Sequence, residues 1–175
     1  VVIGNPAVRH VCSVDNDNAQ AGEMATRHLL DQGYKRVAIL AGPKGLTVSK
    51  DRVSGYAKVM AESKLPLLAH YSDFGIDAAR DAGRDILAPS QRPDAIVVMD
   101  DFMAMGVVQA AREQGLEIGT ELGLVSFNDS SVCHVLDHGL TSVSLGIDEM
   151  VRACCTALID LIESKSSTHA QRIIV

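Results

Sequence analysis

Residues 37–56 read VAILAGPKGLTVSKDRVSGY, and this stretch decides the fold. Its first five residues, 37–41, are all apolar, which predicts a buried strand. A glycine-rich turn follows at residues 42–45, and residues 49–62 have the spacing of a helix. A buried strand, a polar turn and a helix in succession are typical of a parallel α/β sheet.

The same alternation continues along the chain. Further strands are expected at residues 68–71, 95–99, 122–127 and 172–175, and further helices at 17–32, 77–87, 101–114 and 148–163. In a parallel sheet the loops that follow the strands all open at one edge, where ligands bind. Short polar or glycine-rich loops follow most of these strands, so we expect their side chains to converge.

Composition and charge narrow the functional class. The chain has 175 residues, enough for one domain or two small lobes, and with 47% hydrophobic and 22% charged residues it has the composition of a soluble protein. Its net charge of −6 repels phosphate backbones, so this chain by itself should not bind nucleic acid. It has no apolar run long enough to span a membrane. Both ends lie within apolar runs, so we expect the chain to be part of a longer protein.

The four cysteines predict neither a disulfide framework nor a metal site. Cys12, Cys133, Cys154 and Cys155 lack the C-x-x-C spacing, and we expect them to be small buried residues in a reducing, cytoplasmic compartment. The alternative is a metal site formed by Cys133, His134 and His138. We disfavour it because no helical pattern supports that segment, and we expect no metal and no cofactor.

No motif predicts an enzyme. Residues 42–45 lack the Gly-Lys-Ser/Thr ending of a phosphate-binding loop, and neither G-x-S-x-G nor H-E-x-x-H occurs. Asp100 and Asp101 follow a strand and could bind Mg²⁺ or act as an acid/base pair. We favour the interpretation in which Asp101 caps the next helix and Asp100 faces the edge of the sheet.

Three residues in the expected edge loops suit a hydroxyl-rich ligand. Arg52 lies in the first turns of a helix, where its guanidinium could donate two hydrogen bonds. Phe74 lies in a polar loop and offers a ring face to an apolar sugar face, while Asn128 can donate and accept. By contrast, His28 falls on the apolar stripe of the helix at 17–32, so we expect a core histidine.

Eight blocks of the sequence carry a family resemblance. They are residues 14–18, 25–42, 49–56, 72–74, 93–97, 100–106, 124–129 and 140–143. In this order they resemble the effector-binding domain of the LacI/GalR family of bacterial transcription regulators. The sequences of residues 14–18 and 126–129 are similar to those of maltose-type regulators.

The resemblance implies a periplasmic-binding-protein-like fold of two lobes, with a small effector held between them. It divides the chain into residues 1–13 (end of the N-terminal lobe and first crossing strand), 14–140 (C-terminal lobe), 141–165 (crossing strand and N-terminal-lobe helix) and 166–175 (return strand). The helix-turn-helix that reads DNA would lie upstream of this chain.

The resemblance also implies the effector-binding residues. They are Arg52, Phe74, Asp100 and Asn128, with Gly4, Asn5 and Leu145 as additional contacts. Gly4 and Leu145 stand where family members often carry polar contacts, which implies an effector unlike lactose or purine.

The expected partners are a small, sugar-like effector, a second copy of the chain, and operator DNA through the upstream domain. Dimerisation is expected through the helix that carries Phe102, Met103, Val107 and Ala110, and through residues 132–136. The alternative function is a periplasmic sugar-binding protein of a transporter, because these proteins share the fold.

Overall fold

Residues 1–6, 11–88, 92–136, 139–163 and 172–175 are described by the computed structural model. The chain divides into two units, each described by itself. The larger unit comprises Ala19–Ser144, and the smaller unit joins Val1–Asn18 to Leu145–Val175.

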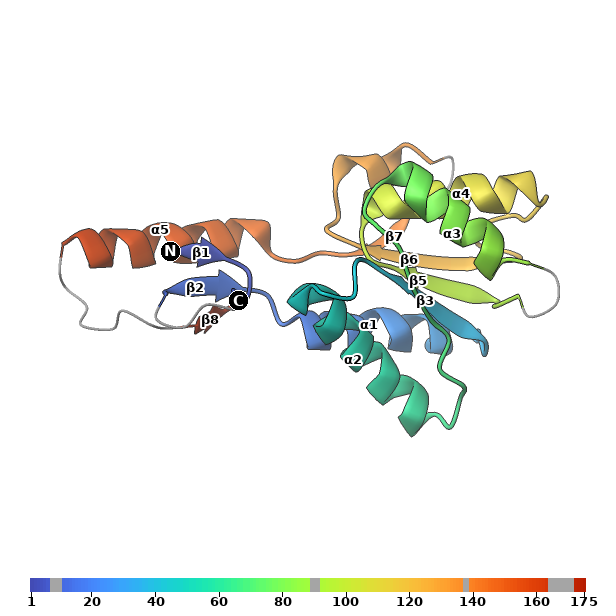
Figure 1. The fold of residues 1–175 in the computed structure, drawn as a ribbon, viewed down its shortest axis with the longest axis horizontal. Coiled ribbons are helices and arrows are strands. Elements are labelled where there is room, and N and C mark those ends of the chain that lie inside the picture. Colours follow the sequence, from blue (N-terminus) through green and yellow to red (C-terminus); the bar gives the residue numbers. More distant parts are fainter. Residues whose placement is uncertain (7–10, 89–91, 137–138, 164–171) are drawn as a thin grey trace. The chain divides into compact units, whose positions relative to one another are not determined.

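The larger unit is built on a five-stranded parallel sheet (Figure 1). Its strands, in chain order, are β3 (Val37–Ala41), β4 (Ala69–Tyr71), β5 (Ala95–Val98), β6 (Gly123–Phe127) and β7 (Thr141–Val143). In space the order is β4-β3-β5-β6-β7, so the chain moves outward from β3 to β4 and then crosses to β5 on the other side. The carboxyl ends of β3 and β5 therefore form a topological switch point, where α/β proteins bind ligands.

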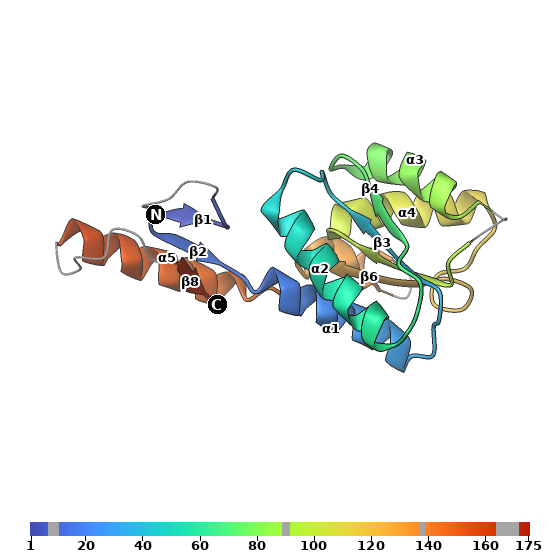
Figure 2. The ribbon, with the colours of Figure 1, turned by 60° about the horizontal axis from the view of Figure 1, so that its bottom comes forward.

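Helices cover both faces of this sheet. They are α1 (Asn18–Asp31), α2 (Thr47–Glu62), α3 (Ile76–Ile86) and α4 (Asp101–Glu113), and a 3-10 turn, η1 (Ser131–His134), precedes β7. Figures 1 and 2 show α1 and α2 on one face and α3 and α4 on the other.

Each helix pair meets at a glycine. A Cβ atom at Gly55 of α2 would lie 2.0 Å from the carbonyl oxygen of Ala19 in α1, and one at Gly106 of α4 would lie 2.2 Å from that of Ile76 in α3. No side chain fits in either place, so the close approach of each pair depends on its glycine.

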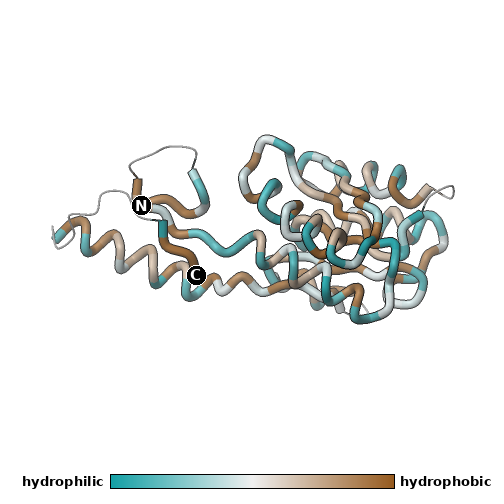
Figure 3. Tube along the Cα trace, turned by 90° about the horizontal axis from the view of Figure 1, so that it is seen from below, coloured by the Kyte–Doolittle hydropathy of each residue, from teal (hydrophilic) through white to brown (hydrophobic). Residues whose placement is uncertain are grey.

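The core lies along the central strands, where Figure 3 shows the hydrophobic stretches of this unit. Every residue of β3 and β5 is buried. Tyr56 of α2 is also fully buried, and its hydroxyl donates to the carbonyl of Val37 at 2.8 Å and accepts from the Leu68 N–H at 2.9 Å. Burial raises the pKa of this hydroxyl, with a smaller opposite effect from the Leu68 N–H, so Tyr56 stays neutral and joins α2 to the sheet.

The smaller unit contains a three-stranded parallel sheet and one helix. The strands are β1 (Val2–Ile3), β2 (Ser13–Asp15) and β8 (Arg172–Ile174), in the order β1-β2-β8, and the helix is α5 (Ile147–Ile162). Arg172 and Asp15 form an ion pair at 3.2 Å between β8 and β2. Several apolar side chains of α5 are exposed: Ile147, Val151, Leu158, Ile159 and Ile162.

The predicted parallel α/β fold is confirmed, and each helix or strand whose range was predicted begins and ends within two residues of that range, while β1 and η1 were not predicted. The strand predicted as a crossing at 141–143 is the fifth strand of the larger sheet, paired with β6. The domain boundaries stay a prediction. No described helix is both long and apolar enough to span a membrane.

Three burial predictions were wrong. His28 is exposed: Ala21, Ala25 and Leu29 of the predicted stripe are buried, whereas His28 and Met24, which is 55% exposed, lie along the other side of that stripe. Cys12 and Cys133 are buried as expected, but Cys154 is half-buried and Cys155 is exposed, since only part of α5 packs on its small sheet.

The third correction concerns the face of α4 predicted for dimerisation. Met103, Val107 and Ala110 are fully buried in the core of the larger unit, where α4 packs against α3 and the sheet. Only Phe102, which is 56% exposed, points outward from that set.

We predict that Gly106→Ala destabilises the larger unit by about 1 to 3 kcal/mol, because the added methyl group pushes α4 away from α3. The measurement is urea unfolding followed by circular dichroism. Gly45→Ala is the matched control, since a Cβ atom there meets nothing within 4 Å. Equal stability of the two variants would contradict the close helix contact.

Candidate functional site

The predicted effector residues of the larger unit follow strands or begin helices at the carboxyl edge of its sheet. Arg52 lies in α2, after β3, and Phe74 lies between β4 and α3. Asp100 lies between β5 and α4, and Asn128 directly follows β6. We call this edge the carboxyl rim. Gly4, Asn5 and Leu145 belong to the smaller unit.

Arg52 is held firmly at the rim. Its side chain is 4% exposed, and Nη1 donates to the carbonyl oxygen of Met99, at the end of β5, at 2.6 Å. The guanidinium carbon also lies 4.2 Å from the centre of the Phe127 ring, at the end of β6. The hydrogen bond and the cation–π contact together fix the guanidinium between two strand ends.

Phe74 depends on a glycine that the sequence analysis did not identify as part of the site. Its side chain is 48% exposed, although it is a large aromatic residue. A Cβ atom at Gly42 would lie 3.0 Å from two carbons of the Phe74 ring. The missing side chain at Gly42 therefore lets the ring lie against the end of β3. The sequence signal that could have identified Gly42 is its position directly after the buried strand at 37–41.

The two adjacent aspartates differ from their expected roles. Asp100, not Asp101, is the N-cap of α4, and its Oδ1 accepts a hydrogen bond from the Met103 N–H at 2.8 Å. Asp101 is the first helical residue and is fully buried. The prediction that Asp101 caps the helix was wrong. A cap at Asp101 would require α4 to begin at residue 102, but α4 begins at Asp101 itself.

Asp101 accepts hydrogen bonds from three serines. Its Oδ1 accepts from the hydroxyls of Ser126 at 2.5 Å and Ser142 at 2.7 Å, and its Oδ2 from the N–H and hydroxyl of Ser130 at 2.8 and 2.7 Å. Burial alone raises the pKa of Asp101, but these hydrogen bonds outweigh it and hold the pKa below its ordinary value of 3.8. Asp101 is therefore an ionised carboxylate whose charge is balanced by hydrogen-bond donors.

Asn128 begins the loop whose Ser130 donates to this carboxylate, and its backbone conformation is unusual. Its φ is +103°, and that of Asp129 is +51°. Both values lie in the left-handed region, which residues other than glycine rarely adopt. Cys133 of η1 is buried nearby, and burial, followed by the hydrogen bond and charge of Asp101, raises the pKa of its thiol. A neutral thiol suits this position.

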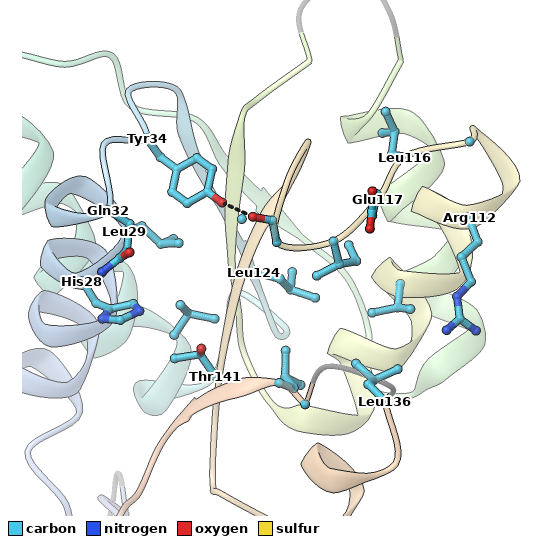
Figure 4. A pocket seen from close by; sticks show the side chains of 18 residues that line it. His28, Leu29, Gln32, Tyr34, Arg112, Leu116, Glu117, Leu124, Leu136 and Thr141 are labelled. Carbon is cyan, nitrogen blue, oxygen red and sulfur yellow. Dashed lines mark hydrogen bonds between the residues drawn. The ribbon is translucent and has the colours of Figure 1, made fainter.

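A cavity of about 860 Å³ lies elsewhere in the larger unit, and none of the four rim residues lines it (Figure 4). It lies beside the first residues of β6, Gly123 and Leu124, where β7 does not yet pair with that strand. His28 of α1 and Arg112 of α4 line it from opposite sides (Figure 4). This cavity accounts for the exposure of His28.

The described residues contain no group of three histidine, cysteine or acidic side chains placed to hold a metal ion. The alternative site with Cys133 and His134 includes His138, which lies outside the described residues.

Comparison with known proteins places residues 26–175 within the model of the periplasmic binding protein-like domain family. The ribose operon repressor of Halalkalibacterium halodurans is 32% identical over 152 residues, which cover 87% of this chain and 46% of the repressor. The chain spans about half the length of the curated relatives it matches.

Two solved structures agree over nearly the whole chain. A complex of the transcriptional regulator CelR with cellobiose has a TM-score of 0.92 and 26% identity, covering 99% of this chain and 54% of that chain. A regulatory protein of the LacI family from Chloroflexus aggregans has a TM-score of 0.87 and 32% identity, covering 98% and 62%.

We predict that Asp101→Asn lowers the free energy of unfolding at pH 7 by about 1 to 3 kcal/mol, because a neutral amide replaces a buried acceptor of four hydrogen bonds. A lowered pKa in the folded state stabilises the fold above the unfolded pKa, and this is lost as the pH falls through the folded value. The deficit of the variant should therefore shrink in acid, below the ordinary pKa of 3.8.

Urea unfolding at a series of pH values measures this deficit. Asp85→Asn is the control, since Asp85 is exposed on α3. A deficit for Asp101→Asn that stays constant between neutral pH and strong acid would show that the carboxylate charge does not stabilise the fold.

Proposed function

Since the chain belongs to the periplasmic binding protein-like domain family, we propose that it is the ligand-sensing domain of a LacI-type bacterial transcription regulator. It binds a small, sugar-like effector and so controls operator binding by a separate helix-turn-helix. Because the chain covers about half of its relatives, the activity and DNA partner of the whole protein are part of this proposal.

The observation that carries the proposal is the fixed guanidinium of Arg52 at the switch point of the sheet. Its hydrogen bond to Met99 and its contact with Phe127 orient it before any ligand arrives. Phe74 adds an exposed ring from the neighbouring loop, and Asp100 and Asn128 add polar groups from the next two. This mixture of donors, acceptors and one aromatic face suits a polyhydroxylated molecule.

The names of the relatives support a sugar as the effector class. One relative is a ribose operon repressor, and one solved structure is a complex with cellobiose. We propose Arg52, Phe74, Asp100 and Asn128 as effector-binding residues, and Gly4, Asn5 and Leu145 as additional contacts.

Regulation is favoured over transport, because the relatives compared are named as repressors or transcriptional regulators. We propose a cytoplasmic protein that binds its ligand without converting it. The polar residues of the rim can hold hydroxyl groups, and the relatives named above are regulators.

Control of DNA binding requires that the effector prefer one state of the protein. Only differential affinity for two states can shift their equilibrium. Couplings of this kind are about 1 to 3 kcal/mol, or roughly 5-fold to 150-fold in operator affinity, and operator DNA must change effector affinity by the same factor.

We further propose a homodimer, since regulators that read two-fold symmetric operators need two identical DNA-binding domains. The surface of the larger unit offers Phe102 of α4, at 56% exposure, and Val135 after η1, at 74% exposure. Contiguous exposed apolar patches mark interfaces between chains, and we propose that Phe102 and Val135 belong to such a patch.

We predict that Arg52→Ala weakens binding of the effector by about 1.5 to 3 kcal/mol, because a charged hydrogen-bond donor is lost from the site. A panel of sugars that includes ribose and cellobiose first identifies the ligand by calorimetry. Arg112→Ala is the control, since Arg112 lines the separate cavity. Unchanged affinity in Arg52→Ala would remove Arg52 from the site, and a product formed from the ligand would indicate an enzyme.

We also predict that Phe102→Asp converts the dimer to a monomer at micromolar concentration, because a carboxylate would be buried without a partner in the interface. Sedimentation velocity measures the mass. Met24→Asp is the matched control, because Met24 is helical and 55% exposed. A monomeric wild type would contradict the dimer, and a dimeric Phe102→Asp variant would place the interface elsewhere.

A further inference from the structure

The loop after β6 has two residues in a row with positive φ, Asn128 at +103° and Asp129 at +51°. Neither is glycine, so each conformation costs free energy and persists only where the surroundings hold it. Asn128 is one of the proposed effector-binding residues, so the groups that hold this loop also decide where its side chain lies.

Three successive backbone N–H groups of the loop are held. That of Asn128 donates to the carbonyl of Val143 at 3.0 Å, and that of Asp129 to the hydroxyl of Ser142 at 2.9 Å. The N–H of Ser130 donates to Asp101 Oδ2 at 2.8 Å. The first of these bonds comes from the strand pairing, and the other two depend on side chains.

Both side-chain contacts lead to the same carboxylate. Ser142, which accepts from Asp129, donates its own hydroxyl proton to Asp101 Oδ1 at 2.7 Å. The hydroxyl of Ser130 donates to Asp101 Oδ2 at 2.7 Å, in addition to its backbone N–H. Asp101 therefore holds Ser130 directly and Asp129 through Ser142.

Asp101 itself cannot touch a ligand in this structure, because it is fully buried. Asp101 directly follows Asp100, which caps α4 at the rim. The start of α4 therefore positions both aspartates. The hydrogen bonds of Asp101 thus fix the Asn128 loop relative to the turn that carries Asp100.

We propose that Asp101 is a positioning residue of the effector site: its carboxylate holds residues 128–130 in the conformation that presents Asn128 to the ligand. This inference rests on the proposed function, in which Asn128 contacts a sugar. It adds to the site a buried residue that does not itself contact the ligand. Asp101 acts through Ser130 and Ser142.

The test compares Asp101→Asn with wild type by site-resolved amide hydrogen exchange and by calorimetry with ribose and cellobiose. We expect the Ser130 amide to exchange about tenfold faster or more in the variant, because hydrogen bonds to charged groups are among the stronger ones. Amides of β5 exchange on overall unfolding and therefore report the loss of overall stability predicted above for this variant, whereas a Ser130 amide that exchanges faster than they do reports local opening of the loop. Affinity for the sugar that binds wild type should fall by about tenfold or more.

Ser142→Ala is the second variant and keeps the carboxylate. It removes the acceptor of the Asp129 N–H, so the Asp129 amide should exchange faster while that of Asn128, bonded to Val143, stays protected. If Asp101→Asn does not fold, this variant carries the same test. Asp85→Asn, an exposed aspartate on α3, is the control for both measurements.

Unchanged exchange of the Ser130 and Asp129 amides in the two variants would overturn the proposal. Faster exchange with unchanged sugar affinity would overturn it as well, because the loop would then move without consequence for the ligand. If wild type binds neither sugar, the proposed sugar effector is in doubt, and the exchange measurement still decides whether Asp101 holds the loop.

Discussion

Parallel pairing of all five strands in the larger unit is the constraint from which its other features follow. Each strand after β3 must be reached by a crossover, and because crossovers are right-handed, the reversal of direction after β4 places α3 and α4 on the face opposite α2; α1 lies on the same face as α2 (Figures 1 and 2). The crossovers begin at one edge, so residues distant in the sequence, such as Arg52 and Asn128, are brought to the same carboxyl rim. The helices can approach each other closely because Gly55 and Gly106 have no side chains.

Local patterns were sufficient to predict the main helices and strands of this fold, though not β1 or η1. The strand at 37–41 was predicted with its observed bounds, because five apolar residues end at a glycine turn. Burial on a helix was less predictable, as His28 shows. The spacing places His28 on the same stripe as Leu29. Whether the sheet covers that part of the stripe depends on where β7 begins to pair with β6, and the helical pattern of α1 carries no information about that pairing.

The candidate site could be predicted in its residue types and general position, but not in its supporting contacts. Arg52 has charged neighbours at Lys50 and Asp51, and only the structure shows that its guanidinium contacts Met99 and Phe127. Asp100 and Asp101 look interchangeable in the sequence. Because α4 begins at Asp101, Asp100 is its cap and the side chain of Asp101 points into the core. There Asp101 accepts hydrogen bonds from serines of β6, β7 and the loop between them.

These supporting contacts bear on how such a domain can bind a sugar, since sugars exchange hydrogen bonds with water for similar ones with protein. The gain from each exchange is small, and a side chain that must become ordered on binding would cancel much of it. Arg52 is already ordered by its carbonyl and its aromatic neighbour, and the Asn128 loop is already ordered by Asp101 and Ser142. The free energy of ordering is then supplied during folding, so a greater part of the hydrogen-bond energy is left to distinguish one ligand, or one state of the protein, from another.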